Sequence, residues 1–214
     1  YVKFGGTKHE RFGKTAFTRD ASEDILMTGT FNSNTLTTTH TSPQQPTPTV
    51  ETSTNRNTDG SDDIFVFRSV QTINRWVTTI GGTGKEIVDS VMIMRVSGLN
   101  IVAGRFHSPT LYVGNNGFST ETNNATSSDA FITIFDKLTN TSTATILISG
   151  AGTEVVFNMT QDSNSGSNFY VVGYFDCPLL TVGTRTLVNK GGRDIFVAKI
   201  TSTGTVTWLK GIGG

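Results

Sequence analysis

The chain has 214 residues, and its 17 Lys plus Arg balance 17 Asp plus Glu, so its formal net charge is zero. The absence of long runs of one sign argues against nucleic acid and anionic membranes as partners. No stretch approaches the roughly 20 apolar residues needed to cross a bilayer, so membrane insertion is not expected. The 23 glycines and the scarcity of helix-forming stretches favour an all-β protein.

One pattern recurs three times along the chain. Each copy opens with two small residues and a glutamate, continues through an apolar run ending in Gly-x-Phe, and then reaches an Asp-x-Phe strand. The openings are Gly5-Gly6 with Glu10, Gly81-Gly82 with Glu86, and Ser149-Gly150 with Glu154. The Gly-x-Phe steps end at Phe31, Phe106 and Phe175, and the later strands begin at Asp63, Asp129 and Asp194. A unit that cannot bury its own faces must stack on copies of itself, so the pattern predicts a repeat architecture.

The repeat boundaries divide the chain into three units of four antiparallel strands each, preceded by one additional strand. We expect residues 1–6 to be the last strand of a preceding unit, and 7–82, 83–150 and 151–214 to be the three units. In the third unit the strands are predicted at about 155–160, 169–175, 195–201 and 206–212. Two of these runs are apolar at consecutive positions, which is typical of strands covered on both faces.

Differences in unit length are confined to the segment between Gly-x-Phe and Asp-x-Phe. In the first unit this segment, about residues 37–58, is rich in Thr and contains Pro43, Pro46 and Pro48. Proline donates no ladder hydrogen bond, and the segment has little apolar surface. We therefore predict a solvated, mobile loop that is open to O-glycosylation and dispensable for folding.

The third unit carries the clearest resemblance to a known family. The residues concerned are Asn168–Phe175, Gly191–Lys199, Trp208 and Gly213-Gly214. This unit resembles the seven-bladed β-propeller repeat (SBBP-type) family of secreted and surface proteins, which implies a propeller-like array of four-stranded blades in an extracellular protein. The second unit departs from the repeat at Ala144-Thr145, where a tryptophan is expected, and at Ser149, so its last strand should be the least regular.

Three blades do not close a ring, because propellers normally have four to eight. Residues 1–6 align with the last strand of the third unit, yet their three partner strands are missing from the chain. We therefore expect this strand to pair with another copy of the chain or with a further part of a longer polypeptide.

The repeated acids are the first candidate site. Glutamates and aspartates at matching positions could ring a channel and hold cations, or they could accept backbone N–H groups of the preceding turn. We favour the second interpretation. The segment 55–62 offers Asn55, Asn57, Asp59 and Asp62 as weak calcium ligands. It lacks the glutamate of a calcium loop, because Val66 occupies the twelfth position, so no cofactor is expected, with calcium as the alternative.

Catalysis is not predicted from the remaining reactive side chains. His9, His40 and His107 occupy unrelated positions of the repeat, which suits neither a zinc site nor a nucleophile with its base. Cys177 is the only cysteine, so no internal disulfide can form, and we expect it to be buried. The chain is therefore expected not to be an enzyme.

Two further features concern the surface. Asn124, Asn140 and Asn158 begin N-glycosylation tripeptides, which mildly favour a secreted or cell-surface glycoprotein. Trp76 and Trp208 belong either to the core between units or to a site that stacks sugars. The leading hypothesis is a non-enzymatic, extracellular structural or adhesive propeller module, part of a larger surface protein or an assembling subunit. The alternative is a lectin-like propeller that binds glycans.

Overall fold

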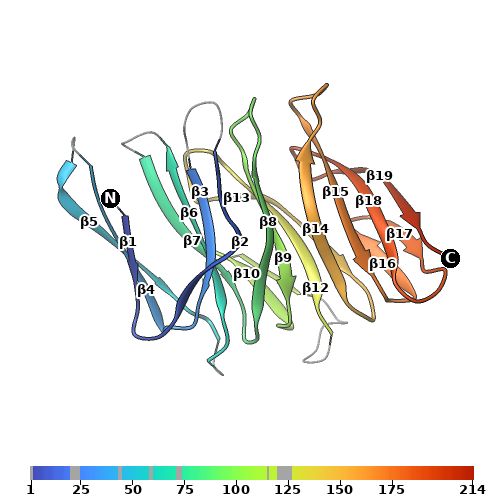
Figure 1. Cartoon of the computed structure of the whole chain (residues 1–214), viewed down its shortest axis with the longest axis horizontal. Helices are drawn as coiled ribbons and strands as arrows, with labels where there is room; N and C mark the ends of the chain where they lie inside the picture. The colour runs from blue at the N-terminus through green and yellow to red at the C-terminus, as the bar shows by residue number, and fades with distance from the viewer. Residues whose placement is uncertain are drawn as a thin grey trace.

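The computed structural model describes residues 2–19, 25–42, 45–57, 60–70, 74–114, 116–119 and 127–214. Every element in these ranges is a β-strand, which confirms the prediction of an all-β protein. Within them no helix could span a membrane. The strands form four antiparallel sheets that stand in a row, with the two chain ends at opposite ends of the row (Figure 1).

The N-terminal sheet contains β1 (Val2–Gly5), β4 (Thr35–Ser42) and β5 (Gln45–Thr54), in the order β1-β4-β5. The second sheet runs β11 (Asn116–Ser119), β10 (Thr110–Val113), β7 (Asn74–Gly81), β6 (Asp63–Val70), β3 (Ile25–Phe31) and β2 (Glu10–Arg19). The third runs β17 (Arg185–Val188), β16 (Leu179–Val182), β13 (Ser142–Ser149), β12 (Asp129–Phe135), β9 (Asn100–Phe106) and β8 (Glu86–Ile93). The C-terminal sheet runs β14 (Glu154–Gln161), β15 (Asn168–Phe175), β18 (Asp194–Thr201) and β19 (Val206–Ile212).

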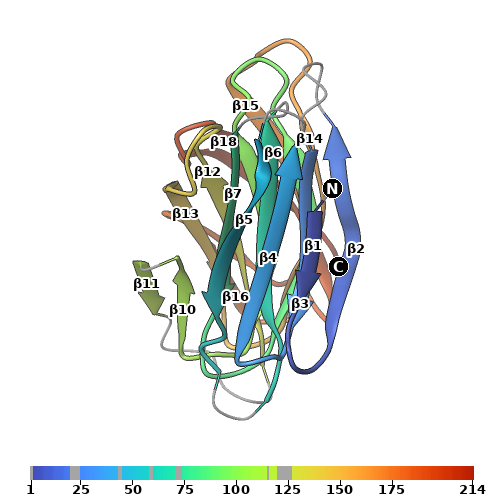
Figure 2. The same cartoon turned by 90° about the vertical axis from the view of Figure 1, so that its left-hand side faces the viewer.

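The Thr/Pro-rich segment of the first unit forms a β-hairpin, so the prediction of a mobile loop is wrong. Strands β4 and β5 pair from Thr35↔Thr54 to His40↔Thr49. Two of the prolines lie in β5, an edge strand of its sheet (Figure 2), where one side of the strand has no neighbour that needs an N–H donor. Residues 43, 44, 58 and 59 lie outside the described residues.

Each variable segment adds a hairpin to the sheet that precedes its own unit. Strand β4 pairs with β1, β10 with β7, and β16 with β13. The register is the same in all three, since the pairs are Gly5↔Thr37, Gly81↔Tyr112 and Ser149↔Thr181. Strand β1 thus finds a partner within its own chain, which corrects the expectation that it pairs elsewhere. Its other edge has no partner strand among the described residues.

The phenylalanines of the Asp-x-Phe strands are buried at equivalent positions, as predicted. Phe65, Phe131 and Phe196 are each at most 1% exposed. They belong to the central strands of β2-β3-β6-β7, β8-β9-β12-β13 and β14-β15-β18-β19. The expectation that β13 would be the least regular last strand is not supported, because its pairing with β12 contains one register shift, as does the pairing of β19 with β18.

The two recurring motifs meet across neighbouring strands. The glycine of Gly-x-Phe lies opposite the phenylalanine of Asp-x-Phe in the pairs Gly29↔Phe65, Gly104↔Phe131 and Gly173↔Phe196. A Cβ added at any of these glycines would lie closer than 3.0 Å to the carbonyl oxygen of the strand on its other side. At Gly173 it would also meet the Phe196 ring closer than 3.0 Å. The ring therefore occupies the space that a side chain would need.

This packing predicts a cost for adding one methyl group. We expect Gly173→Ala to lower the free energy of unfolding by about 1–3 kcal/mol, because the backbone or the Phe196 ring must move. Gly5→Ala is the control, since a Cβ there meets nothing within 4 Å. Thermal unfolding of both variants measures the difference, and equal midpoints would show that Gly173 is not under this constraint.

Candidate functional site

The repeated acids meet in pairs at the junctions between sheets. Asp63 of β6 contacts Glu86 of β8 where the second sheet packs on the third. Asp129 of β12 contacts Glu154 of β14 where the third packs on the C-terminal sheet. All four side chains are 0% exposed. The sequence showed that the acids recur but not that the aspartate of one unit meets the glutamate of the next.

A small hydrogen-bonding residue supports each glutamate. It lies two positions after the phenylalanine of Gly-x-Phe: Ser33 donates to Glu10, Ser108 donates to Glu86, and Cys177 contacts Glu154. Cys177 is fully buried, as predicted. Its thiol takes the place of the serine hydroxyl in the last copy.

The acids also explain the paired small residues that open each unit. A Cβ at Gly81 would collide with the Asp63 carboxyl, and a Cβ at Gly82 would collide with Ser108. Backbone N–H groups bind the same acids, as at Gly82 to Glu86 (3.2 Å) and at Arg56 to Asp63 (2.7 Å). These bonds confirm for Asp63 and Glu86 the interpretation that the acids accept backbone N–H groups, whereas Glu154 accepts none in the described part of the chain.

Burial sets the charge of these junctions. Burial is the largest cause that raises the pKa of Glu154 to about 8; the nearby Asp129 and Asp176 act in the same direction, and the contact with Cys177 opposes them. Burial also raises the pKa of Glu86 and of Asp63, although the backbone N–H of Arg56 opposes the shift at Asp63. A carboxyl with a raised pKa holds its proton near neutral pH, so each pair can avoid burying two negative charges together. Such a closed pair can share a proton, but no substrate can reach it.

Two of the calcium candidates, Asn55 and Asn57, have side chains that already accept backbone N–H groups. The side-chain oxygen of Asn55 accepts the N–H of Asn57, and that of Asn57 accepts the N–H of Gly60, both at 2.8 Å. Asp62 is half-buried, and Asp59 lies outside the described residues. Within the described ranges no three or more His, Cys, Asp and Glu side chains are grouped to hold a metal.

The two tryptophans have different surroundings. Trp76 is 6% exposed, its ring lies 5.7 Å from Phe135 of the third sheet, and its Nε1 donates to the carbonyl of Lys137 at 3.3 Å. It belongs to the core between two sheets and offers no open ring face to a sugar. Trp208 of the C-terminal sheet is half-buried, and its ring lies 6.0 Å from that of Tyr170.

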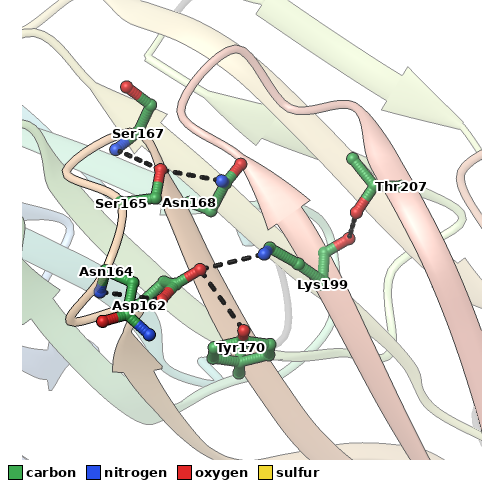
Figure 3. Close-up of polar contacts among 8 residues, drawn as sticks. All are labelled: Asp162, Asn164, Ser165, Ser167, Asn168, Tyr170, Lys199 and Thr207. Atoms are coloured by element: carbon green, nitrogen blue, oxygen red, sulfur yellow. Dashed lines mark hydrogen bonds and ion pairs between the residues drawn. The ribbon is translucent and has the colours of Figure 1, made fainter.

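A polar cluster surrounds Tyr170, one member of this aromatic pair (Figure 3). Asp162 binds Lys199 through an ion pair of 2.9 Å and accepts the Tyr170 hydroxyl at 3.3 Å. The Lys199 ammonium also lies 5.3 Å from the centre of the Tyr170 ring. Sequence reasoning missed this cluster, because the Gly-x-Phe and Asp-x-Phe motifs that recur in all three units include neither Asp162 nor Lys199.

The other predicted surface residues do not gather into one site. Asn140 and Asn158 are exposed, whereas Asn124 lies outside the described residues. His9 is exposed, and His107 is half-buried with its Nδ1 3.0 Å from the carbonyl oxygen of Lys85. The side chain of His40 is not among those described.

Comparison with protein-family models finds no family that matches the chain, and comparison with curated proteins finds no similar protein.

Proposed function

We propose that the chain is a non-enzymatic structural or adhesive module of the β-propeller type, secreted or held at the cell surface. In this proposal the module acts by binding through the faces of its sheets and not by catalysis in a cleft. The support comes from the two inner junctions, where one sheet contributes an aspartate and an apolar face, and the next unit contributes a glutamate and a hairpin.

One observation carries this proposal: the face that is covered in the inner sheets is open in the C-terminal sheet. Val66 and Ile132 are 0% exposed, whereas Val197 at the equivalent position is only half-buried. Ile80 and Ile148 are likewise 0% exposed, whereas the equivalent Ile212 is 61% exposed. Within the described residues, a neighbouring sheet covers these positions in the inner sheets, and none covers them in the C-terminal sheet.

We call this surface the open face. Its apolar and aromatic members are Tyr170, Val172, Tyr174, Ile195, Val197, Trp208 and Ile212. Contiguous exposed apolar surface of this kind marks interaction sites in soluble proteins. The face resembles the inner junctions in composition, so another sheet of the same kind would fit it.

Sedimentation velocity over a range of protein concentrations tests the proposal. The chain should associate as its concentration rises, and Val197→Glu should abolish that association by placing a charge at the centre of the open face. Thr186→Glu is the control, because Thr186 is exposed on β17, outside this face. A chain that sediments as a monomer at every concentration would contradict self-assembly.

A specific observation also favours the second candidate, carbohydrate binding. Tyr170 and Trp208 form an accessible aromatic pair beside the charged groups of Asp162 and Lys199. A depression of about 190 Å³ adjoins the same tyrosine and is lined in part by Asn158. Aromatic rings that stack on a sugar, beside groups that bind its hydroxyls, are the usual components of such a site.

A glycan array separates the two candidates. If the chain binds sugars, Trp208→Ala should remove the signal while the protein stays folded, because Trp208 is only half-buried. Trp76→Ala should instead destabilise the core between two sheets. An array with no signal for the wild-type chain would remove this second candidate.

A further inference from the structure

The C-terminal sheet lacks the hairpin that each inner sheet has, and the N-terminal sheet has such a hairpin without the four strands of a preceding unit. Each inner sheet has six strands, four from one unit and a hairpin from the next unit. The C-terminal sheet has only its own four strands, and the outer edge of β19 has no neighbour in the described chain. The N-terminal sheet holds the hairpin β4–β5, and β1 occupies the place of the last strand of a preceding unit.

We infer that β19 of one copy pairs with β4 of a second copy, displacing β1, and so completes a six-stranded sheet between two copies of the chain. The inference rests on the proposed self-association and adds its partner, its edge and its register. The open face of the first copy would then pack on the second sheet of the second copy, as the inner sheets pack on one another.

The register follows from the three hairpins already present. Ile212 occupies the position in the repeat that Phe4, Ile80 and Ile148 occupy in the other last strands. Those three residues pair with the hairpins as Phe4↔Thr38, Ile80↔Val113 and Ile148↔Val182. We call the pairing of β19 with β4 of a second copy the joint. It should therefore pair Ile212 with Thr38 and Gly211 with Thr39. This register also places the side chains on the correct face of the sheet. Phe4, which now pairs with Thr38, points toward the second sheet, where its ring centroid lies 5.1 Å from that of Phe65. Ile212, on the open face, would point in the same direction.

The buried acids support the same joint. Asp194 is 3% exposed, and its Oδ2 accepts the backbone N–H of Lys190 at 2.7 Å, as Asp63 accepts that of Arg56. Its equivalents Asp63 and Asp129 each contact the glutamate of the next unit. Glu10 of a second copy is the matching glutamate, and Ser33 already holds it as Ser108 holds Glu86.

Strand β1 opposes the joint, because it covers the edge of β4 within each copy. It contributes four residue pairs and the ring of Phe4, which contacts both Phe65 and Phe67. Strand β19 is longer, with seven residues, and would bring Ile212 to the place of Phe4. Displacement of β1 therefore exchanges one set of pairs for another, and removing β1 should favour the joint.

Disulfide cross-linking between two variants, each with one added cysteine, tests the register directly. A chain with Gly211→Cys is mixed with a chain with Thr39→Cys, because directly opposite residues have Cβ atoms about 4.5–5.5 Å apart. Position 211 tolerates the change, since its added Cβ would meet only ordinary contacts at 3.5 Å and beyond. Thr47→Cys, exposed on β5, replaces Thr39→Cys in the control mixture, and the buried Cys177 is common to all.

We expect the mixture of the Gly211→Cys and Thr39→Cys chains to form a mixed disulfide dimer on mild oxidation, and the control mixture to form little. Deletion of residues 1–5 from the Thr39→Cys chain should raise the yield of mixed dimer several-fold. Equal yields in the two mixtures, or no mixed dimer from the full-length chains, would overturn the inference. If association is lost in Val197→Glu yet this cross-link never forms, self-assembly stands and the joint proposed here is wrong.

Discussion

Phe196→Ala is expected to lower the free energy of unfolding by about 3–5 kcal/mol, the usual cost of removing a fully buried phenylalanine. The ring is 0% exposed and lies in the core between the third and C-terminal sheets. It also fills the space over Gly173 on the neighbouring strand. Alanine would leave both the core and the glycine uncovered, so the cavity cost adds to the lost burial.

Thermal or denaturant unfolding measures this effect against a matched control. Thr47→Ala should change the free energy of unfolding by less than about 0.5 kcal/mol, because Thr47 is exposed on β5. For a chain of this length the Phe196 variant should melt roughly 10 °C lower. Similar midpoints for the two variants would contradict the burial of the Asp-x-Phe strand.

Glu154→Gln is expected to flatten the dependence of stability on pH. The pKa of Glu154 is about 8 in the folded chain, mainly through burial, against an ordinary value of 4.5. Between these two pH values the folded state therefore binds more protons than the unfolded state. The protonated carboxyl contributes its full stability below about pH 4.5, and this contribution is lost as the pH rises toward 8. Glutamine resembles the protonated acid in shape and does not titrate.

Urea unfolding at several pH values between 5 and 8 checks this expectation. The wild-type chain should lose stability over this range, and Glu154→Gln should lose less. The same substitution at the half-buried Glu10, at the open N-terminal end of the array, provides the control. If the wild-type and Glu154→Gln chains show parallel profiles, the proton at this junction does not contribute to stability.

Much of the fold could be predicted because its signals are local. The four strands expected in the third unit differ from β14, β15, β18 and β19 by at most one residue at each end. The consecutive apolar residues and the glycine turns that mark them are read within a few positions. The hairpin β4–β5 could not be predicted this way, since its threonines and prolines are typical of a loop. It becomes a sheet because β1, about 30 residues earlier, supplies an edge.

Only part of the candidate site could be predicted from the sequence. The recurrence of Glu86 and Asp63 showed that these positions matter in every unit, and the proposed bonds to backbone N–H groups are present. Their contact across a junction depends on how one sheet stacks on the next, which no local pattern encodes. The ion pair of Asp162 and Lys199 joins residues outside the recurring Gly-x-Phe and Asp-x-Phe motifs, so the repeat did not indicate it.

Amide hydrogen exchange in β19 tests the central claim, that the C-terminal sheet is an unfinished junction completed by another copy. In dilute solution the amides of Val206–Ile212 that point away from β18 should exchange quickly, because their edge is unpaired in the described chain. In concentrated solution they should become protected, while the amides of β13, already covered by β16, should not change. Exchange in β19 that is equally fast at both concentrations would contradict the claim.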